Sequence, residues 1–408
     1  MKERYPLVKN TASFFVVLCI IFIPFPFSLA SFQLQLTDFF FGKLIGIVSK
    51  NLFGIELKNT KVYSDSVSMY ILALLLFILS VVIASALTRI SKWKQYRAKI
   101  LIVCYNVCCY YLALQLLKYG VGKIFKQQFY LPEPNTLYTS MGQVSKDLLY
   151  WSSMGTSYSY NVFAGLIEVV TALLLLFKRT RLIGLLIAFA ALLHIVALNF
   201  GFDISVKLYS LFLLFLCLYL LAPYCISLYH FFWLHKNPAD KPIDDNIVLL
   251  KHSFAVVFIK SLIVGLVLAE VFYPFVKTRN FNDDLATRPF LHGAYEVTQL
   301  IQGTDTLALA SSPVKRFFIH RNGYIIFQNP KDEMEDFKLT YEKEQQQFIL
   351  QDYQLHTTRL KYSYQPKDST LTLQYFNAGK EYKLSGKALE WRKLPALQKG
   401  FHWTADGD

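Results

Sequence analysis

The chain has 408 residues, of which 54% are hydrophobic and 17% charged, and it carries a formal net charge of +14. This composition is too apolar for a protein of that length that is soluble throughout. Residues 274–408 contain 18 basic and 16 acidic side chains, so most of the positive charge lies in the first 273 residues, where Lys and Arg orient membrane helices. The charge therefore does not indicate a nucleic-acid partner, and no aromatic–basic recognition pattern suggests one.

Seven apolar stretches in the first 273 residues are each long enough to cross a lipid bilayer. A hydrocarbon core of about 30 Å needs roughly 20 helical residues. The predicted spans are residues 13–30, 67–87, 100–119, 160–177, 182–200, 206–232 and 254–273. A cleaved signal peptide is the alternative for the first stretch, but its length and its two prolines, Pro24 and Pro26, favour an uncleaved span.

The basic residues between these spans fall on alternate sides of the membrane. The N-terminus and residues 89–99 and 178–181 are rich in Lys and Arg, and all lie on one side. The positive-inside rule makes that side cytoplasmic, and residues 235–251 join it there. Because the number of spans is odd, we expect a cytoplasmic N-terminus and an exported C-terminal domain.

Two long outer loops contain apolar residues of their own. Residues 35–65 include the run Phe39-Phe40-Phe41 and more apolar residues between 44 and 48, which predict an interfacial or re-entrant helix. Residues 120–158 contain a second amphipathic stretch, followed by Leu131-Pro132-Glu133-Pro134. Such segments either roof a cavity or, on the more cautious interpretation, pack among lipid headgroups.

The C-terminal part changes to the period of two that β-strands show. From Glu296 onward apolar residues alternate with polar ones, and Asn322-Gly323 between two apolar runs is the strongest short hairpin signal. Three later strands are predicted at residues 360–364, 371–376 and 382–384. We expect an antiparallel meander of about seven or eight strands, either a small barrel or a curved sheet. A packed interior is the default expectation, and an apolar ligand inside it is the alternative.

The six cysteines all lie in apolar stretches. Cys104 and Cys108 share one helix face, a spacing that suits a soft metal or a redox pair, but no His or acidic residue supplements them. Buried helix cysteines usually pack as small hydrophobic residues. We therefore predict no metal site. No cofactor is evident either, since the sequence contains no histidines at haem spacing, no Gly-rich phosphate loop and no nucleophile elbow.

Ionisable side chains at membrane depth are candidate functional groups, because lipid makes their burial expensive. Glu168 and Lys260 lie at comparable depth near the middle of their spans, so they are predicted to form a structural ion pair. His194 lies about one and a half turns below the outer surface. Further polar candidates near that surface are Lys118, Lys123, Lys126, Gln128, Asp203, Lys207 and Glu270.

Two interpretations fit these groups. In the first, the outer Lys and Glu side chains snorkel at helix ends, as proposed for Lys118, Lys207 and Glu270, and Glu168–Lys260 locks the bundle. In the second, the groups line a polar cavity that opens outward and binds a polar headgroup or handles protons. The candidate ligand-binding residues are then Glu168, His194, Lys123, Gln128, Asp203 and Lys207.

Several segments resemble the family of DoxX-like membrane proteins. Residues 165–170, Gly-Leu-Ile-Glu-Val-Val, are similar to that family's second core helix, and Tyr119-Gly120-Val121-Gly122-Lys123, running on to residues 128–132, to the end of its first. Motifs of a longer subgroup of Bacteroidota type, which carries a C-terminal β domain, are Pro24-Phe25-Pro26, Ser64-Asp65-Ser66, Asp203-Ile204-Ser205-Val206-Lys207-Leu208 and Lys399-Gly400-Phe401-His402-Trp403. The chain departs from the subgroup at Val62-Tyr63-Ser64, directly before Asp65, and after Trp403.

The resemblance implies a bacterial inner-membrane protein with a periplasmic β domain and a four-helix core. The expected regions are two membrane helices with an outer segment at 1–99, the DoxX-like core at 100–232, a cytoplasmic loop and last helix at 233–273, and the antiparallel β domain at 274–408. We expect an accessory protein that binds a ligand or partner, with a lipid or quinone in its cavity and a membrane or periplasmic protein as partner. Some relatives are subunits of thiosulfate:quinone oxidoreductase, so a membrane subunit of a quinone-linked oxidoreductase is the alternative. A transporter is a third hypothesis.

Overall fold

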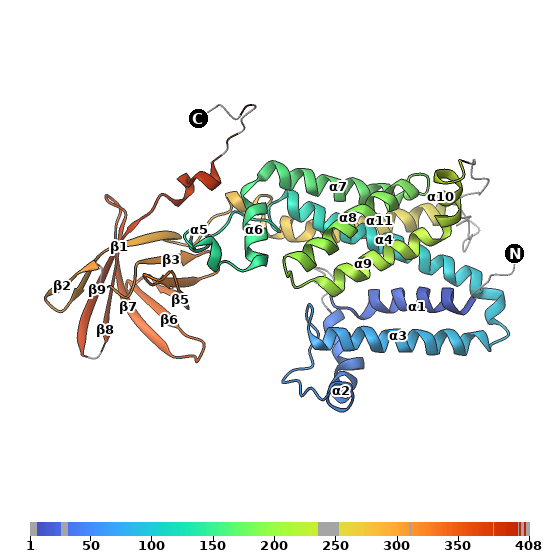
Figure 1. Ribbon diagram of the computed structural model, residues 1–408, viewed down its shortest axis with the longest axis horizontal. Helices are drawn as coiled ribbons and strands as arrows, with labels where there is room; N and C mark the ends of the chain where they lie inside the picture. Colours follow the sequence, from blue (N-terminus) through green and yellow to red (C-terminus); the bar gives the residue numbers. More distant parts are fainter. Residues whose placement is uncertain are drawn as a thin grey trace. The chain divides into compact units, whose positions relative to one another are not determined.

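The computed structural model describes residues 6–25, 32–235, 253–309, 312–377, 379–398, 400 and 404. They fall into two compact units (Figure 1). The helical unit comprises residues 1–128 and 159–281, and the β unit comprises residues 129–158 and 282–408. The end of the first predicted span, the loop 236–252 and most of the 399–403 motif lie outside the described residues.

Among its described residues, the helical unit contains six helices that are long and apolar enough to cross a membrane, so the chain is a multi-pass membrane protein. Its helices are α1 (Pro6–Phe22), α2 (Gln33–Phe53), α3 (Val67–Thr88), α4 (Trp93–Ile124), α7 (Tyr158–Leu176), α8 (Arg181–Gly201), α9 (Lys207–Leu221), α10 (Cys225–Phe232) and α11 (Ser253–Thr278). Helices α9 and α10 together form one apolar stretch, interrupted at Pro223. The first predicted span, residues 13–30, is described only as far as residue 25, and the described helix there, α1, has 17 residues and ends at Phe22.

Helix α1 ends early because Pro24 cannot continue it and two side chains of α2 cap its last turn. The Gln33 amide donates hydrogen bonds to two carbonyl oxygens of that turn, at 3.0 and 3.1 Å, and accepts one from the Phe25 N–H at 2.8 Å. The Thr37 hydroxyl donates to a third carbonyl at 2.6 Å. The polar groups that a helix end exposes are thus satisfied within the unit.

Helix α4 is the central helix of the unit. Its 32 residues would extend about 48 Å. It packs against α1, α3, α9 and α11. Over half of the residues in its most apolar stretch are buried, a larger share than in any other described span. Each of the other helices therefore meets α4 or one of its neighbours.

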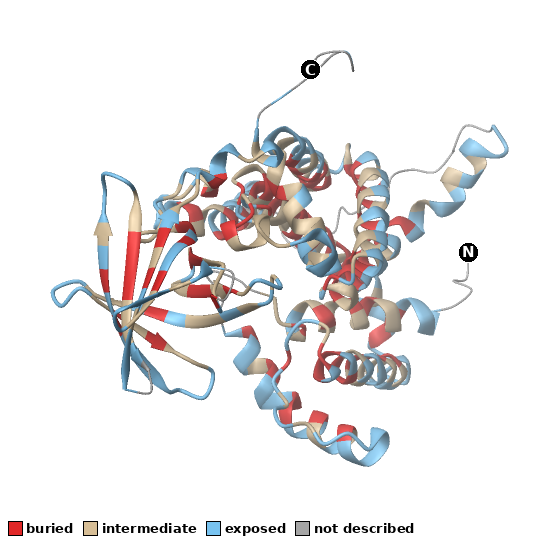
Figure 2. Ribbon diagram, turned by 60° about the vertical axis from the view of Figure 1, so that its left-hand side comes forward, coloured by how far each residue is buried: buried red, intermediate tan, exposed pale blue. Residues whose placement is uncertain are grey.

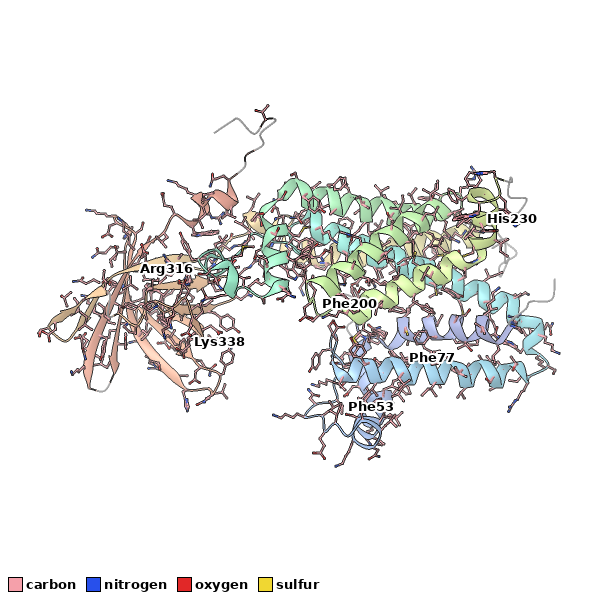
Figure 3. The ribbon with its side chains drawn as sticks, viewed as in Figure 1. Phe53, Phe77, Phe200, His230, Arg316 and Lys338 are labelled. Atoms are coloured by element: carbon pink, nitrogen blue, oxygen red, sulfur yellow. The ribbon has the colours of Figure 1, made fainter. Side chains whose placement is uncertain are left out.

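Helix α2 lies across the direction of its neighbours. Figure 1 shows it almost end-on, whereas α1 and α3 lie in the plane of the view. Its outer face exposes large apolar side chains, including Phe39, Ile47 and Phe53, of which Phe53 is labelled in Figure 3. A crosswise helix with such a face suits a membrane interface, as the sequence predicts for residues 35–65.

The β unit is a closed antiparallel barrel. The strands are β1 (Gly293–Gln302), β2 (Asp305–Leu307), β3 (Arg316–His320), β4 (Tyr324–Gln328), β5 (Met334–Glu342), β6 (Gln347–Gln351), β7 (Thr357–Gln365), β8 (Thr370–Asn377) and β9 (Lys380–Ala388). Consecutive strands pair from β3 to β9, and β1 pairs with both β3 and β9, which closes the ring. Buried and exposed residues alternate along the strands (Figure 2). The predicted antiparallel meander and the Asn322-Gly323 hairpin are confirmed, and of the two forms expected, a small barrel or a curved sheet, the structure shows the barrel.

Residues 129–158 belong to the same compact unit as the barrel, whereas the sequence-based boundaries include them in the region 100–232. This segment contains α5 (Pro134–Leu137) and α6 (Lys146–Thr156), and α5 contacts β1 and β3. Tyr138 stacks on Phe318 of β3, and the guanidinium of Arg316, labelled in Figure 3, lies 5.0 Å from the Tyr138 ring centre. The segment 129–158 thus covers apolar residues on the outer face of β3, a long-range contact that a local sequence pattern does not reveal.

Candidate functional site

Helices α4 and α7 approach each other most closely at two glycines. A Cβ atom on Gly120 would lie 2.7 Å from the Gly165 carbonyl oxygen, and one on Gly165 would lie 2.6 Å from the Gly120 carbonyl oxygen. No side chain fits between two backbones at that distance, so small residues are required at this crossing. The two segments that resemble the DoxX-like core therefore meet each other in space.

An ion pair lies one helical turn beyond the glycines. Lys123 follows Gly120 by three residues and Glu168 follows Gly165 by three, which places both side chains on the facing sides of α4 and α7. The Lys123 ammonium donates to both carboxylate oxygens of Glu168, at 2.7 and 2.8 Å. The side chains are only 10% and 5% exposed. The close backbone approach thus brings together two charges that neither helix could bury alone.

A second ion pair joins α4 to α11. The Lys118 ammonium lies 2.9 Å from a carboxylate oxygen of Glu270, and both side chains are mostly buried. The same ammonium lies 5.0 Å from the centre of the Phe25 ring, within the range of a cation–π contact. The interpretation of Lys118 and Glu270 as snorkelling side chains is wrong, because each charge is satisfied inside the unit.

Between α1, α2, α3, α4 and α9 lies a cavity of about 490 Å³. Three aromatic rings form part of its wall: Phe25 stacks on Tyr209 with ring centres 5.3 Å apart and meets the edge of Tyr119 at 6.0 Å. The lining residues are Pro24, Phe25, Gln33, Leu34, Val62, Tyr63, Ser64, Met69, Tyr119, Val206 and Tyr209. The wall is mainly apolar, with a few hydroxyl and amide groups.

Polar groups close to this wall are buried in the bundle. The Tyr209 and Tyr111 hydroxyls are hydrogen-bonded at 2.9 Å. Gln115, one turn from each of Tyr111 and Tyr119 along α4, is fully buried, and neither its amide nitrogen nor its amide oxygen has a hydrogen-bond partner among the described residues. An unsatisfied buried amide costs about 1–3 kcal/mol. Such a group is unusual in a structural core and typical of a place where a ligand or water binds.

One side of the cavity is held by a contact between two segments about 140 residues apart. Asp65, which precedes α3, accepts hydrogen bonds from the backbone N–H groups of Lys207 and Leu208, at 2.8 and 2.9 Å. A carboxylate at the first N–H groups of α9 acts as an N-terminal cap. Lys207 in turn pairs with Asp203 at 2.6 Å. Four of the segments that carry the DoxX-like resemblance therefore contribute residues to the lining of one cavity, namely Pro24 and Phe25, Ser64, Tyr119 and Val206.

The structure brings together only part of the site predicted from the sequence. Lys123 and Glu168 are in direct contact, but Lys260 is exposed on α11, so the predicted Glu168–Lys260 pair is wrong. Equal depth in the membrane did not reveal which way each helix faces. His194 is exposed on α8.

The remaining candidates lie at the ends of helices. Asp203 and Lys207 form the beginning of α9 and pair with each other. Gln128 is half-buried just beyond α4, where its backbone N–H donates to the Gly122 carbonyl oxygen at 3.1 Å. Sequence reasoning missed Gln115, Tyr119 and Tyr209, because uncharged polar residues in apolar helices resemble ordinary core residues. The signal that finds Gln115 is its unsatisfied amide.

The β unit holds a separate group of buried charges. A carboxylate oxygen of Glu133 lies 2.8 Å from Nε2 of His292, with both side chains 5% exposed, and it also accepts a hydrogen bond from the Arg321 backbone N–H at 3.3 Å. The Arg321 guanidinium donates to Asp283 and lies 4.4 Å from the Tyr130 ring centre. These contacts fasten residues 130–133 to the β3–β4 hairpin, so they hold the 129–158 segment on the barrel.

The pKa values in this group follow from burial and neighbouring charge. Burial by itself would raise the pKa of Glu133, but the hydrogen bond and charge of His292 outweigh it and lower that pKa below its ordinary value. Burial would likewise raise the pKa of Asp283, but the hydrogen bond and charge of Arg321, together with those of Arg288, outweigh it and lower that pKa. Burial lowers the pKa of His320, which also borders the group. The arrangement favours ionised carboxylates and a neutral His320.

Among the described residues, no group of three or more His, Cys, Asp and Glu side chains is placed to hold a metal ion. The six cysteines are free thiols, five of them buried. Cys104 and Cys108 lie in the buried face of α4 with apolar neighbours.

Comparison with known proteins yields one relative. Over 120 residues the chain is 33% identical to the uncharacterized protein YwoB of Bacillus subtilis (strain 168), a match that covers 27% of this chain and 70% of that protein. No family model matches the chain, and no solved structure matches it significantly.

Proposed function

We propose that this chain, which belongs to the same family as the YwoB protein of Bacillus subtilis, is a multi-pass membrane protein that binds an amphiphilic ligand, a lipid or a quinone, in the cavity of its helical unit. In this proposal it is a DoxX-like accessory protein of the bacterial inner membrane, with α4 and α7–α10 as the four-helix core. Its N-terminus is cytoplasmic and its barrel is periplasmic, where a membrane or periplasmic protein is its partner.

The observation that carries the proposal is the position of the cavity. Pro24 and Phe25, Ser64, Tyr119 and Val206 come from segments that are distant in sequence, and they line the same space. A purely structural bundle would fill such a space with apolar side chains, since protein interiors are close-packed. A cavity of about 490 Å³ lies within the range of about 300–1,000 Å³ of small-molecule sites.

The chemistry of the wall favours an amphiphile. The aromatic rings of Phe25, Tyr119 and Tyr209 offer flat apolar surfaces, and nearby hydroxyl and amide groups offer a few directed hydrogen bonds. The two ammonium groups near the wall, of Lys118 and Lys123, are each held in an ion pair. They orient the aromatic rings by cation–π contacts at 5.0 and 5.8 Å and are not free counter-ions for an acidic ligand.

A quinone-linked oxidoreductase subunit is the second candidate. The aromatic wall favours it, because a quinone ring is flat and stacks on Phe25 or Tyr119 as readily as these rings pack on each other. The electrons would have to come from a redox centre on a partner protein, which would co-purify with the chain.

Mass spectrometry of the purified full-length protein tests the proposal. The expected result is a lipid or quinone retained in near-stoichiometric amount after exchange into a neutral detergent. Val206→Trp places a large ring in the cavity and is expected to reduce retention at least tenfold. The matched control is Val82→Trp on the lipid-facing side of α3, where Val82 is 57% exposed, and it should retain the ligand as wild type does.

The outcomes separate the two candidates and the failure of both. A bound quinone with a coloured co-purifying partner supports the oxidoreductase subunit, whereas a bound lipid without such a partner supports the accessory protein. Wild-type protein that carries neither, or equal retention by Val206→Trp and wild type, contradicts ligand binding in this cavity.

A further inference from the structure

The interior of the β-barrel is filled at one end only. At the end where β6 begins, the Phe348 ring stacks on Tyr362 with centres 4.2 Å apart. Phe290, which precedes β1, packs against Tyr362 and Tyr341 at 6.3 and 6.2 Å and closes this end. Aromatic side chains from four segments thus form a plug at this end.

The other end contains a cavity of about 650 Å³. It lies where β4, β6 and β8 end and β5, β7 and β9 begin. Most of its wall is apolar; the lining residues are Pro313, Val314, Phe327, Asn329, Glu333, Met334, Glu335, Phe337, Leu350, Thr358, Leu360, Leu373, Tyr375 and Leu384. Barrels of eight strands are just wide enough either to be packed solid or to hold one small ligand.

Exposed apolar side chains lie at the same end of the barrel as this cavity. Tyr353 and Leu355, between β6 and β7, are 83% and 73% exposed, and Phe376 near the end of β8 is 75% exposed. Tyr353 and Leu355 lie in the β6–β7 connection and Phe376 lies in β8, one residue before its end. Exposed large apolar groups at the open end of the barrel favour contact with an apolar molecule there.

The charges at the mouth restrict the ligand. The ionisable residues that line the cavity are two carboxylates, Glu333 and Glu335, and no Lys, Arg or His lines it within the described part of the barrel. Glu335 occupies an inward position, paired in register with Phe327 of β4. The positive side chain of Lys315 is held by Asp332 at 3.1 Å. An anionic headgroup would therefore be repelled at this mouth.

We propose that the barrel binds a single-chain lipid whose headgroup is neutral or positively charged. The hydrocarbon chain lies in the cavity against Leu360, Leu373 and Leu384, and the headgroup lies beside Glu333 and Glu335. This site is distinct from the cavity of the helical unit and stands independently of the function proposed for that unit.

Photolabelling of the full-length protein tests this site. The probe is monooleoylglycerol with a photoreactive diazirine in its acyl chain, and peptide mass spectrometry locates the labelled residues. Labels are expected on the strands that contain Leu360 and Leu373. Unlabelled monooleoylglycerol and oleylamine should compete, and oleate, which has the same chain and an anionic headgroup, should compete at least tenfold less well.

Variants distinguish the barrel site from the helical one. Leu373→Trp fills the cavity and should abolish labelling of the barrel. Thr340→Trp, on the exposed face of the barrel, is the matched control and should be labelled as the wild type is. Val206→Trp in the helical unit should leave labelling of the barrel unchanged. Should Leu373→Trp fail to fold, Glu335→Lys decides, because it leaves the cavity open and is expected to make oleate the better competitor. Labelling confined to the helical unit, or equal competition by oleate and oleylamine in the wild type, overturns the proposal.

Discussion

The two cavities of this protein are built on opposite plans. Two ion pairs lie next to the wall of the helical cavity, because the ammonium groups of Lys118 and Lys123 contact the rings of Phe25 and Tyr119. The cavity of the barrel has an aliphatic wall, and its two carboxylates stand at the mouth. Helices in lipid can bury a charge only beside its partner, whereas a barrel with one open end can leave charges in water.

The difference teaches where each unit is vulnerable. In the helical unit, the charges hold only as long as the backbones of α4 and α7 remain close at Gly120 and Gly165. In the β unit, a glycine has a similar role, since a Cβ on Gly386 would lie 2.5 Å from the ring of Phe317 inside the barrel. The glycines of the helical unit support a polar contact, the Lys123–Glu168 ion pair, whereas Gly386 supports an apolar contact with Phe317.

The largest expected effect comes from breaking the buried pair. Glu168→Ala leaves the Lys123 ammonium buried without its carboxylate and should destabilise the protein by about 3–5 kcal/mol. Equilibrium unfolding in detergent measures the change. The matched control is Glu56→Ala, which breaks the exposed Lys50–Glu56 pair and should cost about 1 kcal/mol or less. Equal costs for the two variants would show that the buried pair is not what distinguishes the helical unit.

The next largest effect is expected from replacing the closely packed glycine in each unit. Gly120→Ala forces apart two backbones, and Gly386→Ala pushes on an enclosed ring, so each should cost about 1–3 kcal/mol. Gly120→Ala should also lower ligand retention by the helical unit, whereas Gly386→Ala should not. Gly265→Ala on α11 is the control, because nothing lies within 4 Å of its added Cβ and Ala favours a helix by about 1 kcal/mol. A thermal melt that ranks Gly265→Ala below Gly120→Ala would contradict the close crossing.

Replacing Gln115 by Met should change stability less than the glycine variants do, and it should stabilise the protein where they destabilise it. The unbranched apolar side chain removes two unsatisfied polar atoms, so thermal stability should rise by about 1 kcal/mol. Ligand retention should fall several-fold at the same time, because the amide can no longer donate or accept. Asn106→Leu on the same helix serves as the control, since the Asn106 amide is already bonded to the Ile102 carbonyl. Unchanged ligand retention in Gln115→Met would assign Gln115 no part in binding.

The smallest effect near neutral pH is expected in the charged group of the β unit. The pKa of His320 is lowered in the folded chain, so the unfolded chain binds more protons just below about pH 6.5, and stability falls as the pH drops through that range. The lowered pKa values of Glu133 and Asp283 have the same sign, and their contribution is lost at more acidic pH, from about pH 4 downward.

Thermal unfolding of the β unit between pH 7 and pH 5 measures this dependence. His320→Gln should flatten it, while His356→Gln, which changes an exposed histidine paired with Asp352, should leave it as in the wild type. A pH dependence that survives in His320→Gln would place its origin elsewhere.

Local patterns in the sequence were sufficient for the class of each part. Long apolar runs predict membrane helices because lipid cannot hydrogen-bond the backbone. Asn322-Gly323 predicts a hairpin because glycine readily adopts the positive φ that such a turn needs, and Gly323 has a φ of 73°. The strands from residue 357 to 388 follow from alternation with a period of two. Each of these signals lies within a few consecutive residues, so no distant contact is needed to interpret it.

Only the tertiary structure decided which residues meet. Depth along a helix is encoded locally, but the direction of a side chain depends on which neighbour the helix packs against, and Glu168 therefore faces Lys123 and not Lys260. The short α1 depends on Gln33 and Thr37 of α2, and the cover of β3 on Tyr138 from a segment between two membrane helices. The sequence by itself thus determined a helical membrane part and a β-barrel, and packing between distant segments determined both cavities.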